Sequence, residues 1–149
     1  MSTWTEQRTA KASPDAVLDV LTDPGACQRW APVGFDVALP AGERLQAGTR
    51  TRVAGRLAGQ HVAFDVRVLA ADRERLTLTA SGPIDLDVEY RLRASDAGSD
   101  LQARIDVTGG GLAGRLLAQA TSALLAAGAL RCALSRIASE AEALVAPAV

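Results

Sequence analysis

Side chains that could carry acid–base or ligand-binding chemistry are few in this chain, and two of them stand close together near its start. Glu6 and Arg8 fall in a strand-like segment over residues 3–12, where alternation with Ala10 places both on the inward face beside Trp4. Opposite charges two positions apart on such a face could pair and fix a polar group of a ligand. The alternative is that this end of the strand lies at the rim of the sheet, where both side chains reach water.

The single tyrosine, Tyr90, is the third candidate for chemistry. It alternates with Val88 and Leu92 on a face that we expect to point inward. A buried tyrosine hydroxyl usually finds a hydrogen-bond partner, and in a pocket it would serve a ligand carbonyl or act as a general acid. A core position and a ligand contact explain this residue equally well, so the catalytic candidates are Tyr90, Glu6 and Arg8.

The remaining reactive side chains give no sign of metal or cofactor chemistry. His61 is the only histidine, and it follows Gly59 and Gln60 at a turn, where a solvated ring is expected. Cys27 and Cys132 form no Cys-x-x-Cys pair and stand far from His61 in the chain, so neither a zinc site nor a disulfide framework is predicted. The chain also lacks a nucleophile elbow, a phosphate loop and a dinucleotide fingerprint. We therefore expect no metal and no cofactor.

Composition and charge limit the classes of partner that we expect for this chain. The 149 residues are the size of one domain, and we expect a single ligand-binding domain over 1–149. Acidic and basic residues nearly balance, 17 against 16, without a basic block, which argues against a nucleic-acid partner. The start of the chain carries charge and no apolar core of signal-peptide length, and no run of about 18 apolar residues is uninterrupted. These features predict a cytoplasmic protein without a membrane span.

The elements that must position the candidate residues follow from turn signals and periodicity. Ser13, Pro14 and Asp15 are typical of a helix start, and residues 22–25 would end that helix before a second short one over 26–30. Apolar and charged residues then alternate along the middle of the chain, which is typical of antiparallel strands with one wet face. The segments with this alternation are 49–53, 62–68, 76–78, 85–93 and 101–107.

A proline-free segment over 112–145 predicts a long C-terminal helix. One apolar stripe runs along it, with leucines and an isoleucine toward the ends and Ala120, Ala123 and Ala127 in the middle. Opposite a curved sheet, small residues would leave an apolar gap, which is what a small-molecule pocket needs. The alternative is close helix–sheet packing, in which small residues only let the backbones approach. The candidates for ligand contact are Trp4, Trp30, Phe35, Phe64, Val88, Ala120, Ala123 and Ala127.

Together these segments predict an α+β domain of the helix-grip kind. We expect a curved antiparallel sheet of about six to seven strands wrapped around the long C-terminal helix, with two short helices after the first strand. Trp30 and Phe35 would flank a proline at the mouth of the sheet, where they either line an entrance or cap the core.

Short motifs in a fixed order add a resemblance to this picture. They read Ala-Ser-Pro-Asp-Ala-Val at 12–17, Leu-Thr-Asp-Pro at 21–24, Arg-Trp-Ala-Pro at 29–32, Leu-Gln-Ala-Gly-Thr at 45–49, Tyr-Arg-Leu at 90–92 and Gly-Ser-Asp-Leu at 98–101. Over nearly its whole length the chain resembles the SRPBCC superfamily, the START-like and birch-pollen-allergen-like proteins that include polyketide cyclases and dehydratases. Leu18, where such proteins usually carry an aromatic residue, and Ser99, where they usually carry threonine, depart from the pattern.

The resemblance implies a cavity between the sheet and the C-terminal helix, and functions that range from carrier to cyclase. No universal catalytic set belongs to the superfamily, so no catalytic residue is carried over. We expect a protein that binds a small hydrophobic or polycyclic metabolite, either as a polyketide cyclase- or dehydratase-like enzyme or as a non-catalytic carrier or sensor of lipid-like molecules. A protein-interaction module is a third hypothesis, against which the charged outward faces argue. A homodimer is left open.

Overall fold

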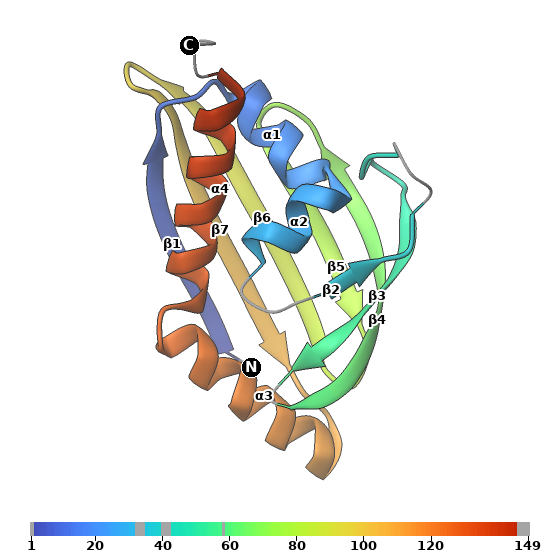
Figure 1. Ribbon diagram of the computed structural model, residues 1–149. Helices are drawn as coiled ribbons and strands as arrows, with labels where there is room; N and C mark the ends of the chain where they lie inside the picture. The colour runs from blue at the N-terminus through green and yellow to red at the C-terminus, as the bar shows by residue number, and fades with distance from the viewer. Residues whose placement is uncertain (1, 32–34, 40–42, 58, 146–149) are drawn as a thin grey trace.

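The architecture is a seven-stranded antiparallel sheet whose concave face is covered by helices (Figure 1). The computed structural model describes residues 2–31, 35–39, 43–57 and 59–145. The strands of this described part follow the order β1-β7-β6-β5-β4-β3-β2 across the sheet. Their bounds are β1 Ser2–Ala10, β2 Phe35–Val37, β3 Arg50–Leu57, β4 Gln60–Ala71, β5 Arg75–Ser81, β6 Asp85–Ser95 and β7 Gly98–Thr108. The helices are α1 Pro14–Thr22, α2 Pro24–Trp30, α3 Gly111–Ala126 and α4 Ala129–Val145.

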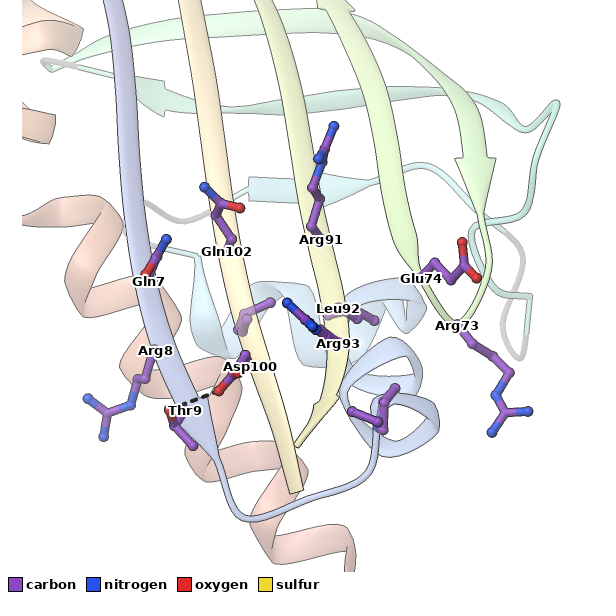
Figure 2. Close-up of a pocket in the computed structure, with 13 residues that line it drawn as sticks. Gln7, Arg8, Thr9, Arg73, Glu74, Arg91, Leu92, Arg93, Asp100 and Gln102 are labelled. Carbon is purple, nitrogen blue, oxygen red and sulfur yellow. Dashed lines mark hydrogen bonds between the residues drawn. The ribbon is translucent and has the colours of Figure 1, made fainter. Parts of the chain in front are cut away.

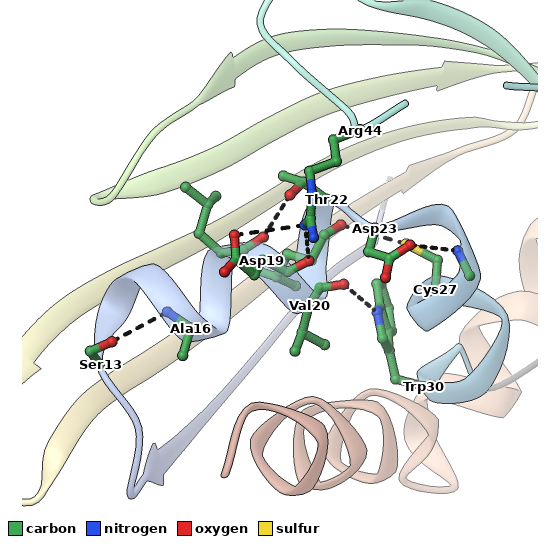
Figure 3. A network of polar contacts seen from close by, with 12 residues as sticks. Ser13, Ala16, Asp19, Val20, Thr22, Asp23, Cys27, Trp30 and Arg44 are labelled. Atoms are coloured by element: carbon green, nitrogen blue, oxygen red, sulfur yellow. Dashed lines mark hydrogen bonds and ion pairs between the residues drawn. The ribbon is translucent and has the colours of Figure 1, made fainter. Parts of the chain in front are cut away.

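The first of the two short helices after β1 begins where the sequence predicts, and the second begins at Pro24, two residues before the predicted start at Ala26. The Ser13 hydroxyl accepts a hydrogen bond from the Ala16 amide at 3.3 Å, and a proline occupies the first turn of α1. Asp23 ends α1 and caps α2, because its carboxylate accepts from the Gly25 amide at 3.0 Å. Figure 3 shows this pair of helices and Arg44, which donates to the Asp19 carbonyl at 2.8 Å. The caps fix the turn that lays both helices over the sheet.

The C-terminal helix α4 lies over the concave face beside β1 and packs against α1 and α2 (Figure 1). Its apolar stripe is buried as the sequence predicts, at Leu130, Leu134, Ile137 and Ala141. The core that it completes contains Leu101 and the other inward residues of the sheet. The predicted helix-grip α+β fold is confirmed.

The prediction of one unbroken helix over 112–145 is wrong in one respect. The segment is divided into α3 and α4, which are bent by 57° at Ala127 and Gly128. Gly128 has φ +99, a left-handed conformation that ends a helix and that glycine adopts without steric cost. The bend turns α3 to a different face, so Leu117 and Thr121 are buried there instead of the predicted stripe.

The helices of the described chain are short relative to a bilayer. No single one is long and apolar enough to cross a membrane. Helices α3 and α4, which are bent relative to each other, reach the length and apolar composition of a membrane span only when they are counted together.

The outer face of the sheet is polar. Strand register places Arg91 directly opposite Arg75 on β5, and Arg52 opposite Asp65 on β4. Arg91 also pairs with Glu89 on its own strand at 2.7 Å. Inward and outward residues alternate along most of each long strand, so most of the apolar set lies on the concave face. Leu69, at the register shift of β4, is an exposed exception.

Candidate functional site

An apolar cavity lies between the concave face of the sheet and the helices. It has a volume of about 270 Å³ and is lined from β3 to β7, from α1 and α2, and from α3 and the first residue of α4. This volume is close to the lower end of small-molecule sites, about 300 Å³. No charged side chain is found among the described residues that line it. The polar groups in its wall come from Cys27, Thr51, Tyr90, Thr121 and the indole of Trp30.

Tyr90 supplies the phenolic hydroxyl of this wall. Strand pairing places it between Leu76 and Ala103 on the concave face, where it is buried. Burial raises the pKa of the Tyr90 hydroxyl well above its usual value, and the nearby Cys27 raises it further. Within the described residues the hydroxyl has no hydrogen-bond partner. The group therefore stays protonated and has an unused donor at the cavity.

Cys27 and Trp30 are held on the cavity side of α2 by main-chain carbonyls. The Cys27 thiol donates to the Leu21 carbonyl at 3.5 Å, and the Trp30 indole donates to the Val20 carbonyl at 3.3 Å (Figure 3). Burial, with a contribution from Asp23, raises the pKa of Cys27 to about 12. Since a thiolate is the nucleophilic form, Cys27 acts as a neutral part of the wall.

Helix α3 contributes a part of the wall that sequence reasoning missed. Thr121, Leu124 and Leu125 line the cavity, and the Thr121 hydroxyl donates to the Leu117 carbonyl at 2.9 Å. The bend at Gly128 brings this face of α3 inward, whereas one straight helix would present a different stripe. A glycine within a helical pattern is the signal that could have identified the break.

The predicted ligand contacts divide into three groups. Trp30, Phe64 and Val88 line the cavity, as does Tyr90. Trp4 packs against the core with its indole N–H buried and without a partner, but it does not line the cavity. The Phe35 side chain lies outside the described residues.

The three alanines that the sequence places in the cavity wall lie elsewhere in the structure. Ala123 and Ala127 are exposed, Ala120 is half-buried, and none of the three lines the cavity. The physical reason is the bend at Gly128, which directs positions 121, 124 and 125 inward instead.

The predicted Glu6–Arg8 pair is not formed. Glu6 instead lies 3.6 Å from the guanidinium of Arg131 on α4, and Arg8 is exposed. Neither residue lines the cavity, so the structure does not bring them to Tyr90. Because β1 is an edge strand, inward side chains near its end reach water around the edge.

A second and larger depression lies at one end of the sheet (Figure 2). It has a volume of about 1160 Å³, is open to solvent, and is lined by polar side chains that include Arg8 and Arg93. Two of its arginines already have carboxylate partners, since Arg73 lies 2.9 Å from Asp15 and Arg91 pairs with Glu89. The groove is polar and its charges are largely compensated, so the apolar cavity is the better candidate for an apolar ligand.

Metal ligation has no support in the described residues, where no group of three or more histidine, cysteine, aspartate or glutamate side chains could hold an ion.

A curved sheet wrapped around a C-terminal helix, with an uncharged cavity between them, defines a helix-grip ligand-binding protein. The model of one family, polyketide cyclase / dehydrase and lipid transport, matches residues 1–142, and the chain belongs to that family.

Solved structures share this fold at low sequence identity. Protein CV1439 from Chromobacterium violaceum is 22% identical, with 98% of each chain covered and a TM-score of 0.69. TTHA0849 from Thermus thermophilus is 16% identical, with 97% of this chain and 100% of that chain covered and a TM-score of 0.71. DynU16, a protein in the dynemicin biosynthetic locus, is 22% identical, with 95% of this chain and 48% of that chain covered and a TM-score of 0.61. No curated protein matches the chain.

Proposed function

We propose that the protein binds one small, neutral and largely apolar molecule in the cavity, and that Tyr90 donates a hydrogen bond to an acceptor oxygen of that molecule. The observation that carries the proposal is an uncharged apolar wall with one unpartnered hydroxyl in it. A hydrogen bond from this hydroxyl to a ligand carbonyl would contribute about 0.5–1.5 kcal/mol to binding. A charged ligand is disfavoured because no opposite charge on the described wall would offset its desolvation.

Non-catalytic binding, as a carrier or sensor, fits this wall better than acid–base catalysis. Tyr90 remains protonated and can donate but not accept a proton, and no carboxylate or histidine is found in the described lining to serve as a base. The Glu6 and Arg8 side chains lie outside the cavity.

A polyketide cyclase-like activity is the second candidate. The family description and the membership of DynU16 in a biosynthetic locus favour it. In that role the apolar walls would hold a flexible substrate in a folded conformation, while Tyr90 polarises a carbonyl.

The experiment pairs two substitutions on one helix. Thr121→Phe places a ring in the cavity, whereas Ala123→Phe places the same ring on the exposed side of α3. We expect the first to abolish binding of the neutral dye Nile red and the second to leave it unchanged, with both variants folded by circular dichroism. Leu125→Phe replaces Thr121→Phe if that variant does not fold.

Native mass spectrometry of the wild type then identifies the class of a co-purified ligand. A wild type that carries no small molecule and binds no neutral apolar probe would contradict the proposal. Dye binding that survives both cavity substitutions would place the dye elsewhere and contradict it equally.

A further inference from the structure

The solvent-exposed side of α3 carries several apolar side chains. Leu112 is 79% exposed, Leu116 60% and Leu124 37%, and Ala113 and Ala123 are exposed on the same helix. We call this set of five residues the α3 outer face. Half of the large exposed apolar side chains of the described chain lie on this one helix, and such a cluster is typical of an interaction surface.

The segment that contains the α3 outer face has no acidic residue. Residues 109–139 contain no aspartate or glutamate and include Arg115, Arg131 and Arg136, of which Arg131 lies 3.6 Å from Glu6 on β1. This contrasts with the chain as a whole, in which acidic residues slightly outnumber basic ones. Arg115 is exposed on α3 and forms no ion pair within the described residues. An apolar helix face with one unpaired arginine and no aspartate or glutamate is complementary to a surface that has an apolar interior and negatively charged groups at its edge.

The same helix forms part of the cavity wall. Leu124 belongs to the α3 outer face and also lines the cavity, beside Leu125 and Thr121. The exposed apolar surface and the cavity lining therefore share Leu124.

Glycines bracket α3 at both ends. Gly111 has φ +70 and Gly128 has φ +99, and a Cβ built on either residue would meet no atom within 4 Å. Both positions need a left-handed conformation rather than tight packing. The two glycines therefore set the direction in which α3 leaves β7 and meets α4.

We propose that the α3 outer face docks on the surface of an anionic lipid bilayer, from which the cavity takes or to which it delivers its apolar ligand. This inference rests on the proposed function. The leucines would enter the boundary between headgroups and acyl chains, and Arg115 would extend its side chain to a lipid phosphate.

A second copy of the chain fits this face less well. A symmetric contact through the α3 outer face would bring two Arg115 side chains together without an acidic partner on the helix. Acidic residues at the neighbouring ends of the strands do not oppose the lipid. Asp87 and Asp106 are paired in register on the outer face of the sheet, opposite to the face on which α3 packs.

The test uses co-sedimentation with vesicles of phosphatidylcholine alone and with about one-third phosphatidylglycerol. We expect the wild type to bind the anionic vesicles preferentially and to be released by salt. The double variant Leu112→Gln/Leu116→Gln should lose about tenfold in vesicle affinity. The matched control is Leu69→Gln, which removes an exposed leucine from a strand far from α3.

Nile red binding in solution separates this inference from the proposed function, because the double variant leaves the cavity wall intact. Retained dye binding with lost vesicle binding supports docking by α3. Equal vesicle binding by wild type and double variant, or no vesicle binding by a wild type that binds dye, overturns it. A dimer in light scattering that the double variant dissociates, without vesicle binding, would also overturn it and assign the face to a second copy.

Discussion

The ring of Trp30 stands edge-on to the ring of Tyr90, with centroids 6.0 Å apart and planes at 79°. Trp30 comes from α2 and is anchored by its indole N–H to the Val20 carbonyl, so the short helices fix the tyrosine from the side. Edge-to-face geometry is a favoured arrangement of two aromatic rings. The contact explains how a strand residue without its own hydrogen-bond partner is held in one orientation beside the cavity.

Tyr90→Phe should separate binding from stability. The variant keeps the ring contact with Trp30 and removes a hydroxyl that has no partner in the described chain, so the free energy of unfolding should not fall. Affinity for a carbonyl-bearing ligand should fall by roughly 2–10-fold, the equivalent of one hydrogen bond.

Isothermal calorimetry with a ligand and its analogue lacking the carbonyl is the appropriate measurement. The analogue should bind the wild type and the variant equally. Equal loss for both ligands would show that the hydroxyl shapes the cavity and does not recognise an oxygen.

The two cysteines should differ in reactivity and in their effect on stability at high pH. Cys27 is half-buried with its pKa raised to about 12, whereas Cys132 is exposed. A disulfide reagent at neutral pH should therefore modify Cys132 rapidly and Cys27 much more slowly.

The raised pKa of Cys27 also determines whether this thiol stabilises or destabilises the fold as pH rises. The unfolded thiol ionises near its ordinary pKa of 9.0 and the folded thiol near 12, so the unfolded state binds fewer protons between these values. Stability from this group is fully present below pH 9 and is lost as pH rises toward 12. Cys27→Ala should flatten the alkaline fall of the melting temperature, and an unchanged pH profile would contradict the burial of this thiol.

Sequence reasoning succeeded where one residue determines local geometry by itself. Ser13 and Pro14 specify the start of α1 through a cap that needs only the next turn of chain. It left two alternatives open where position in the whole sheet decides. Glu6 and Arg8 point inward by alternation, but β1 is the edge strand, so Glu6 meets Arg131 and Arg8 meets water.

The bend between α3 and α4, which the apolar periodicity did not reveal, can be tested at Gly128. Alanine at this position has space for its methyl group but must adopt φ +99, so Gly128→Ala should lower the free energy of unfolding by about 1–2 kcal/mol. Gly128→Asn is the comparison, because asparagine adopts the left-handed conformation more readily than alanine. Urea denaturation should show a smaller loss for asparagine than for alanine. Equal losses would mean that the bend does not depend on the left-handed conformation.

On the outer face of the sheet, removing an arginine should change the free energy of unfolding in opposite directions at two positions. Arg75 faces Arg91 across the β5–β6 ladder, and like charges directly opposite each other destabilise a sheet. Arg52 faces Asp65 across the β3–β4 ladder, where the charges are opposite. Arg75→Thr should therefore raise the free energy of unfolding by about 0.2–1 kcal/mol, and Arg52→Thr should lower it by a similar amount.

Both effects are electrostatic and exposed, so about 1 M salt should reduce both. Urea denaturation at low and high salt measures the two differences on the same scaffold. If Arg75→Thr destabilises the protein at low salt, then the guanidinium of Arg75 makes a favourable contact that outweighs its repulsion by Arg91. If both changes persist at high salt, they arise from the strand preference of threonine and not from charge.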